Sequence, residues 1–126
     1  MAVSLRPLSP ISDDDLLALS KQNPGYQLER DASGALVVTP TGSESGRRGS
    51  ELGYQLQVWA KHADNGFVFG ADAGFVLPDG SLRSPDASWI AKDRWTSLPV
   101  VEREGFAHLC PDAVFEILSR SDDRGD

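Results

Sequence analysis

The stretch Ala113-Val-Phe-Glu-Ile-Leu118 is apolar apart from one carboxylate, and its length suits a single buried β-strand. A carboxylate inside such a strand is costly to bury unless it is paired with a cation or bound to a metal ion. Glu116 therefore needs a partner. Two interpretations stay open from this stretch alone: Glu116 lies at a strand end facing solvent or an arginine, or it belongs to a functional site.

Asp86 is a second acid in a comparable position. It opens a short strand over residues 86–90, where Pro85 fixes the entry and alternation sends Asp86 and Ser88 to the same side. Two acids on neighbouring strands can share Mg²⁺, which prefers oxygen ligands and keeps several waters. We therefore predict that the carboxylates of Asp86 and Glu116 lie within about 6 Å of each other, close enough to share one ion.

The segments before these strands predict an α/β fold. Ser12 precedes three acids and an apolar stretch, which is typical of a capped short helix. Residues 26–30 and 35–39 flank a turn-rich segment and predict a β-hairpin. Residues 1–11 and the polar end at 119–126 are expected to be loose, and the whole chain to form one domain over residues 1–126.

The longest helix is predicted between residues 43 and 63, where the apolar spacing changes to the helical period. Leu52, Leu56 and Trp59 share one face of it. We expect this face to pack against a sheet that includes three strands, at residues 67–70, 86–90 and 113–118.

Composition narrows the class of protein. The chain has 126 residues, of which 40% are hydrophobic and 25% charged, as in an ordinary globular domain. It shows neither a membrane-spanning run nor a signal peptide, so we expect a cytoplasmic protein with no membrane partner. The single cysteine, Cys110, is expected in or near the core, and His62 and His108 are expected to be structural.

The net charge of -7 counts against an extended nucleic-acid surface, because phosphate contacts need clustered lysine and arginine. A site that binds Mg²⁺ through carboxylates is acidic by necessity, however, and the bound ion locally reverses the sign of the field. DNA therefore stays open as a partner.

Several segments, taken in order, resemble the Uma2 type of restriction endonuclease in the PD-(D/E)xK nuclease superfamily. They are Thr41-Gly-Ser-Glu-Ser-Gly-Arg-Arg48, Ser50-Glu-Leu52, Arg83-Ser-Pro-Asp-Ala-Ser-Trp89, Glu102-Arg-Glu-Gly-Phe106 and Cys110-Pro-Asp112, followed by Glu116 and Ser119. The resemblance implies a restriction-endonuclease-like core, with a central mixed sheet and a long helix packed on it. It also implies a DNA endonuclease that uses Mg²⁺ or Mn²⁺ held by Asp86 and Glu116.

An acid on the long helix is expected to join these two. Glu44 and Glu51 are the candidates, and we favour Glu51 as the third catalytic residue. Arg47 and Arg48 are candidates for DNA binding, since a helix N-terminus favours phosphate. The alternative is that these acids and arginines pair with one another at helical spacing.

The chain departs from the superfamily pattern at one position. The superfamily carries a lysine two residues after the second acid, where this chain has Leu118. The resemblance also implies that a last helix and strand lie beyond Asp126, so that the chain is truncated at its C-terminus. Three hypotheses follow: a DNA endonuclease, completed by a second chain in a homo-oligomer or strand-swapped dimer; a catalytically inactive remnant; or a non-enzymatic interaction module that pairs through an exposed edge.

Overall fold

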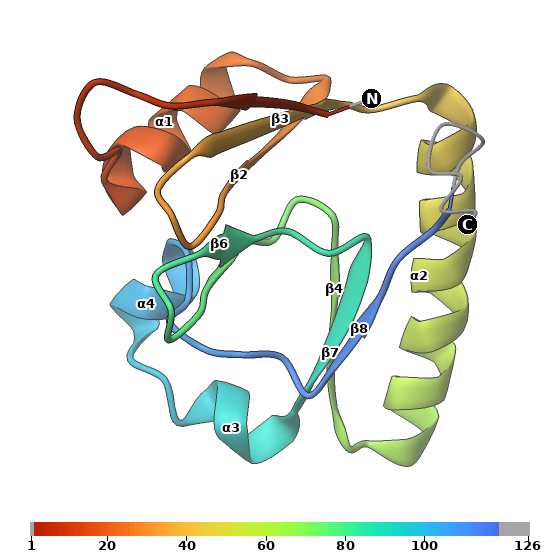
Figure 1. Cartoon of the computed structure of the whole chain (residues 1–126). Coiled ribbons are helices and arrows are strands. Elements are labelled where there is room, and N and C mark those ends of the chain that lie inside the picture. The colour runs from red at the N-terminus through yellow and green to blue at the C-terminus, as the bar shows by residue number, and fades with distance from the viewer. Residues whose placement is uncertain (1, 119–126) are drawn as a thin grey trace.

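The computed structural model describes residues 2–118, which form two antiparallel sheets and four helices (Figure 1). The helices are α1 (Asp13–Gln22), α2 (Ser43–Ala63), α3 (Lys92–Thr96) and α4 (Val100–Glu104). The strands are β1 (Val3–Leu5), β2 (Tyr26–Arg30), β3 (Leu36–Pro40), β4 (Gly66–Gly70), β5 (Phe75–Val76), β6 (Leu82–Arg83), β7 (Ala87–Ala91) and β8 (Ala113–Phe115). The α/β class and the long helix are confirmed. Within the described part, no helix is long and apolar enough to cross a membrane.

The first sheet has the strand order β1-β3-β2-β6-β5 and contains the predicted hairpin. The turn of the hairpin depends on Asp31, whose carboxylate accepts hydrogen bonds from the main-chain N–H of Ser33 and Ala35. Gly34 provides the left-handed conformation that this turn needs, with φ of 91°. The hairpin prediction is therefore confirmed, together with the hydrogen-bonding groups that close it.

The N-terminal segment differs from the expectation of a loose arm at residues 1–11. Val3–Leu5 form β1, which pairs antiparallel with β3, with Val3 opposite Val38. The outer edge of β3 would otherwise expose unpaired main-chain groups, and β1 satisfies them. The expectation for residues 119–126 lies outside the described residues. Farther on, the hydroxyl of Ser12 caps α1 as predicted, since it accepts a hydrogen bond from Asp15 N over 3.1 Å.

The second sheet, β4-β7-β8, lies against α2 as the sequence predicts. On the helix, Ala60 is buried, Leu52 and Leu56 are half-buried, and the ring of Trp59 lies 5.6 Å from that of Trp89. The three strands expected to share a sheet do so, and this prediction is confirmed. They pair antiparallel rather than in a mixed sheet, and the remaining strands form the separate first sheet. The last strand is also shorter than the predicted 113–118, since Ile117 N–H donates to a side chain instead of continuing the ladder.

Two hydrophobic clusters form the core. One contains Leu16, Leu28, Val76 and Leu82, beneath α1 and the first sheet. The other contains Phe75, Ile90 and Ala107, beside the second sheet. Adjacent residues of β5 belong to different clusters, so this short strand joins the two halves of the molecule.

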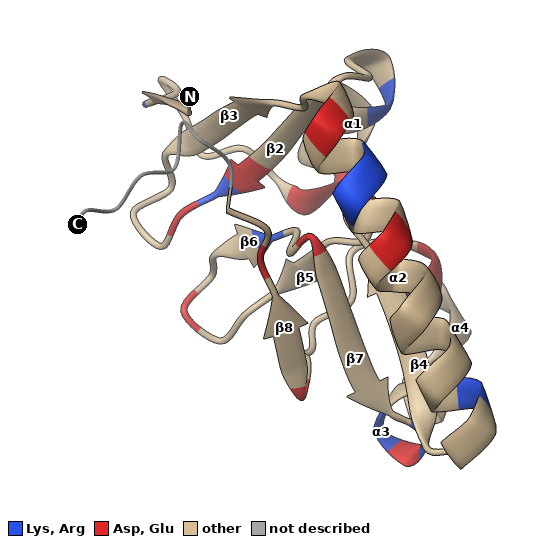
Figure 2. Cartoon of the chain, turned by 90° about the vertical axis from the view of Figure 1, so that its right-hand side faces the viewer, with Lys and Arg blue, Asp and Glu red and all other residues tan. Residues whose placement is uncertain are grey.

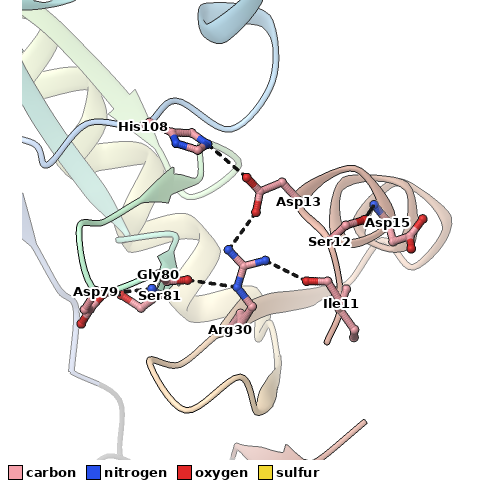
Figure 3. A network of polar contacts seen from close by, with 9 residues as sticks. All are labelled: Ile11, Ser12, Asp13, Asp15, Arg30, Asp79, Gly80, Ser81 and His108. Carbon is pink, nitrogen blue, oxygen red and sulfur yellow. Dashed lines mark hydrogen bonds and ion pairs between the residues drawn. The ribbon is translucent and has the colours of Figure 1, made fainter. Parts of the chain in front are cut away.

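A polar network centred on Arg30 also links distant segments (Figure 3). Its guanidinium group pairs with Asp13 at 2.8 Å and donates to the carbonyl oxygens of Ile11 and Gly80. The other oxygen of Asp13 lies 3.1 Å from Nε2 of His108. Burial acts to raise the pKa of Asp13, but hydrogen bonds from Arg30 and His108 prevail and lower it. His108 is thus structural, as predicted.

Candidate active site

The pairing of β7 with β8 brings Asp86 and Glu116 together. Ala87 lies opposite Phe115 in an antiparallel ladder. Asp86, which comes just before β7, therefore lies opposite Glu116, which comes just after β8. Side chains that face each other in this way have Cβ atoms about 4.5–5.5 Å apart. The charge of Asp86 is among the causes that raise the pKa of Glu116, as expected for two carboxyl groups this close. The structure therefore places the two predicted metal ligands side by side.

The pKa of Glu116 is raised by its surroundings. Although Glu116 is exposed as a whole, partial desolvation of its carboxyl group raises the pKa of Glu116 to about 7, and the neighbouring charge of Asp86 acts in the same direction. Glu29 adds a further negative charge nearby. A cation bound between two carboxylates this close would relieve their repulsion.

Asp86 is held in place by the main chain that follows β8. One of its oxygens, Oδ2, accepts a hydrogen bond from Ile117 N over 2.6 Å. The Ile117 side chain in turn approaches α2, where a Cβ on Gly49 would lie 3.8 Å from its Cδ1. This separation is an ordinary van der Waals contact, so Ile117 packs against α2 next to the acid pair.

Glu29 on β2 is a site residue that the sequence analysis missed. Its Oε2 accepts a hydrogen bond from Ser84 N over 2.7 Å, and Gln27 on the same face donates to Ser84 O. These two contacts fix the main chain immediately before Pro85 and Asp86. The polar alternation of Gln27 and Glu29 along the hairpin was the available signal, but it did not indicate which segment lies opposite.

A cleft of about 490 Å³ opens beside the acid pair, between the two sheets. Its lining includes Glu29, Arg83, Val114, Glu116 and Leu118. Figure 2 shows acidic positions (red) at the end of β2, before β7 and after β8. Leu118, at the position of the superfamily lysine, lies on this cleft with 62% of its surface exposed. The cleft is therefore acidic at one end and apolar along β8.

The charged residues at the start of α2 lie on an exposed face. Arg47 and Arg48 both bond to Glu44, at 2.6 and 3.1 Å. The hydrogen bond from Arg47 is the main cause that lowers the pKa of Glu44 to about 2. Glu51 is exposed and accepts a hydrogen bond from Gln55 over 3.3 Å. Among the described residues, no hydrogen bond or ion pair joins Glu51 to Asp86 or Glu116.

Two neighbouring residues have other roles. Asp112 accepts a hydrogen bond from Ala91 N and pairs with Arg94 at 2.7 Å, so it is structural. The prediction that Cys110 lies in or near the core is wrong, because this thiol is exposed at the cleft. Its flanking loop, rather than a strand, carries it to the surface.

The donor set available for a metal is small. Between residues 2 and 118, no group of three or more His, Cys, Asp or Glu side chains is arranged to hold an ion. Two carboxylates remain, and Mg²⁺ requires few protein ligands because it retains several waters. The hydroxyl of Ser88 is buried on the same strand face as Asp86 and has no hydrogen-bond partner in the described part. Carboxylate oxygen donors of this kind fit a hard divalent cation.

Comparison with known families gives one match. Residues 13–126 match the Uma2 family, whose description is "putative restriction endonuclease". A search of curated proteins finds no match. The matched range covers most of the chain and includes α2, both acids of the pair and the cleft.

Proposed function

The chain belongs to the Uma2 family, and from this premise we propose that it is a DNA endonuclease that depends on a divalent metal ion. The observation that carries the proposal is the contact between Asp86 and Glu116 beside an open cleft. A structural role alone would not account for two like charges held together. A metal ion shared by both would relieve their repulsion.

Asp86 and Glu116 would hold the Mg²⁺ or Mn²⁺ ion. Such an ion supplies a water of lowered pKa and neutralises charge on a phosphate. The protein orients the ligands: Ile117 N–H fixes one oxygen of Asp86, and the ladder fixes the strand that carries Glu116.

In this proposal Glu29 is the third acidic residue of the site. Its charge reaches Glu116, and its bond to Ser84 connects it to the chain entering Asp86. These contacts support Glu29 over Glu51, which is directed toward Gln55 on the exposed helix face. Glu29 would act through waters rather than as a direct ligand, because Asp86 and Glu116 already supply the two carboxylates that would hold the ion.

Arg47 and Arg48 would contact the DNA backbone from the start of α2. Both are exposed, and both are held by Glu44 in the free protein. DNA phosphates would have to compete with that carboxylate. The contribution of each arginine to DNA affinity is therefore expected to be small.

The test is metal binding followed by DNA nicking. Wild type should bind Mn²⁺ in a calorimetric titration, and Asp86→Asn and Glu116→Gln should each reduce the affinity by about tenfold or more. Asp93→Asn, which removes an exposed acid on α3, is the control and should bind as wild type does. Nicking of supercoiled plasmid that depends on Mn²⁺ and disappears in Asp86→Asn would support the endonuclease. Equal Mn²⁺ binding by wild type and Asp86→Asn would refute the site.

A catalytically inactive binding protein is the second candidate. Leu118 favours it, because an apolar side chain lies on the cleft where the superfamily has a lysine. In that case wild type would bind Mn²⁺ and DNA without nicking plasmid. The same pair of measurements therefore separates the two candidates.

A further inference from the structure

Arg83 gives the acidic cleft a single positive charge. Among the described residues that line the cleft, it alone is cationic. The preceding residue of β6, Leu82, is fully buried in the first core cluster. Because side chains alternate along a strand, Arg83 points the other way, into the cleft. Figure 2 shows the basic end of β6 (blue) close to the acidic end of β8, consistent with their shared lining.

Within the part of the chain that the structure describes, the guanidinium group of Arg83 has no close counterion. Within residues 2–118 it takes part in none of the ion pairs, although Glu29 and Glu116 line the same cleft. The charge of Arg83 does act on Asp79: hydrogen bonds from Ser81 lower the pKa of Asp79, and Arg83 adds to this effect. A half-buried arginine without a carboxylate partner is free to bind an added anion.

Phosphate is the anion that suits this arrangement. An anion alone would be repelled by Glu29, Asp86 and Glu116, so it needs a divalent cation on the acid pair. A guanidinium group then binds phosphate oxygens through two parallel hydrogen bonds. Leu118, which lies on the same cleft, has no group that can do so.

From these observations we propose that Arg83 binds an oxygen of the scissile phosphate and supplies, from β6, the positive charge that the chain lacks at position 118. The inference rests on the proposed function, because it places the substrate phosphate between Arg83 and the ion held by Asp86 and Glu116. Binding of DNA in this cleft is therefore expected to require both the ion and Arg83.

The experiment measures DNA binding without cleavage. A fluorescent duplex of about 20 base pairs is titrated with protein in Ca²⁺, which occupies oxygen-ligand sites, and in EDTA. Arg83→Gln should weaken Ca²⁺-dependent binding by about 10- to 100-fold, the loss expected for charged hydrogen bonds to a phosphate. Lys61→Gln removes an equal charge from the exposed end of α2 and should change the affinity by less than about twofold.

Mn²⁺ binding without DNA, measured on the same variants, separates this inference from the proposed function. Arg83→Gln should bind Mn²⁺ as wild type does. If it does, and its DNA affinity equals that of Lys61→Gln, the role of Arg83 is overturned while the metal site stands. If wild type binds no Mn²⁺, both proposals are overturned. Should Arg83→Gln fail to fold, Arg83→Met keeps the apolar stem of the side chain, and the same loss of DNA affinity is expected.

Discussion

Glu116 couples the stability of the protein to pH. Burial, followed by the charge of Asp86, raises the pKa of Glu116 from 4.5 to about 7. An acid whose pKa is raised on folding binds more protons in the folded state, so its contribution is present below the unfolded pKa and decreases as pH rises through the folded value. Without divalent metal, the urea midpoint should therefore decrease between about pH 5 and about pH 8. In Glu116→Gln this part of the pH dependence should be absent; an unchanged slope would contradict the prediction.

Leu118 offers a gain-of-function experiment. It lies on the same cleft as Glu116 and is largely exposed, so a longer side chain has room. Leu118→Lys should add a positive donor beside the acid pair and increase Mn²⁺-dependent nicking by about 10²-fold, the usual value of one such donor. Leu118→Gln, which adds length without charge, should give little increase. Activity in Leu118→Lys that persists after Asp86→Asn would show that the nicking does not come from this site.

The residues of the site differ in how far the sequence predicts them. Asp86 and Glu116 are identified by local patterns, a proline-led strand start and an acid within an apolar strand. Glu29 is not, because its partner Ser84 is 55 positions away and the two meet only through the pairing of β2 with β6. Arg83 is equally hidden, since its direction depends on Leu82 being buried.

At the scale of elements, period and turn chemistry predict most of the fold. The capped α1, the hairpin and α2 follow from short-range signals, and the structure confirms them. The strand at Val3–Leu5 cannot be predicted from such short-range signals, because its stability comes from pairing with the open edge of β3. The shortening of β8 likewise depends on a tertiary contact, the hydrogen bond from Ile117 N to Asp86.

Gly66 makes the pairing of β4 with β7 possible. A Cβ at this position would overlap the carbonyl oxygen of Ile90 and lie 2.6 Å from Nε1 of Trp89. Gly66→Ala should therefore destabilise the protein by about 1–3 kcal/mol in urea unfolding. Gly70→Ala is the matched control at the other end of β4, where a Cβ would meet nothing within 4 Å. Equal stability of the two variants would contradict this account.

The whole molecule consists of two sheets whose cores meet in β5. Phe75 belongs to one cluster and Val76 to the other, while Arg30 and Asp13 connect the hairpin, α1 and the loop of His108. The acid pair and the cleft lie where these halves meet, with Glu29 from the first sheet and Glu116 from the end of the second. Docking of the two halves therefore sets how Glu29 faces the acid pair, which local sequence patterns do not encode, whereas pairing of β7 with β8 forms the pair itself.

Net charge decides how the whole molecule meets DNA. At -7 the protein repels a polyanion, and the proposed contacts are few: Arg47, Arg48 and Arg83, with the metal ion. Each neutralised phosphate contributes about −0.9 to the slope of log affinity against log salt. In constant Ca²⁺ the slope should be no steeper than roughly −3, and each arginine-to-glutamine substitution should reduce its magnitude by up to about 1. EDTA should abolish binding altogether, because the ion is what reverses the charge of the cleft. Tight, strongly salt-dependent binding in EDTA would mean that the DNA binds to a surface other than this cleft.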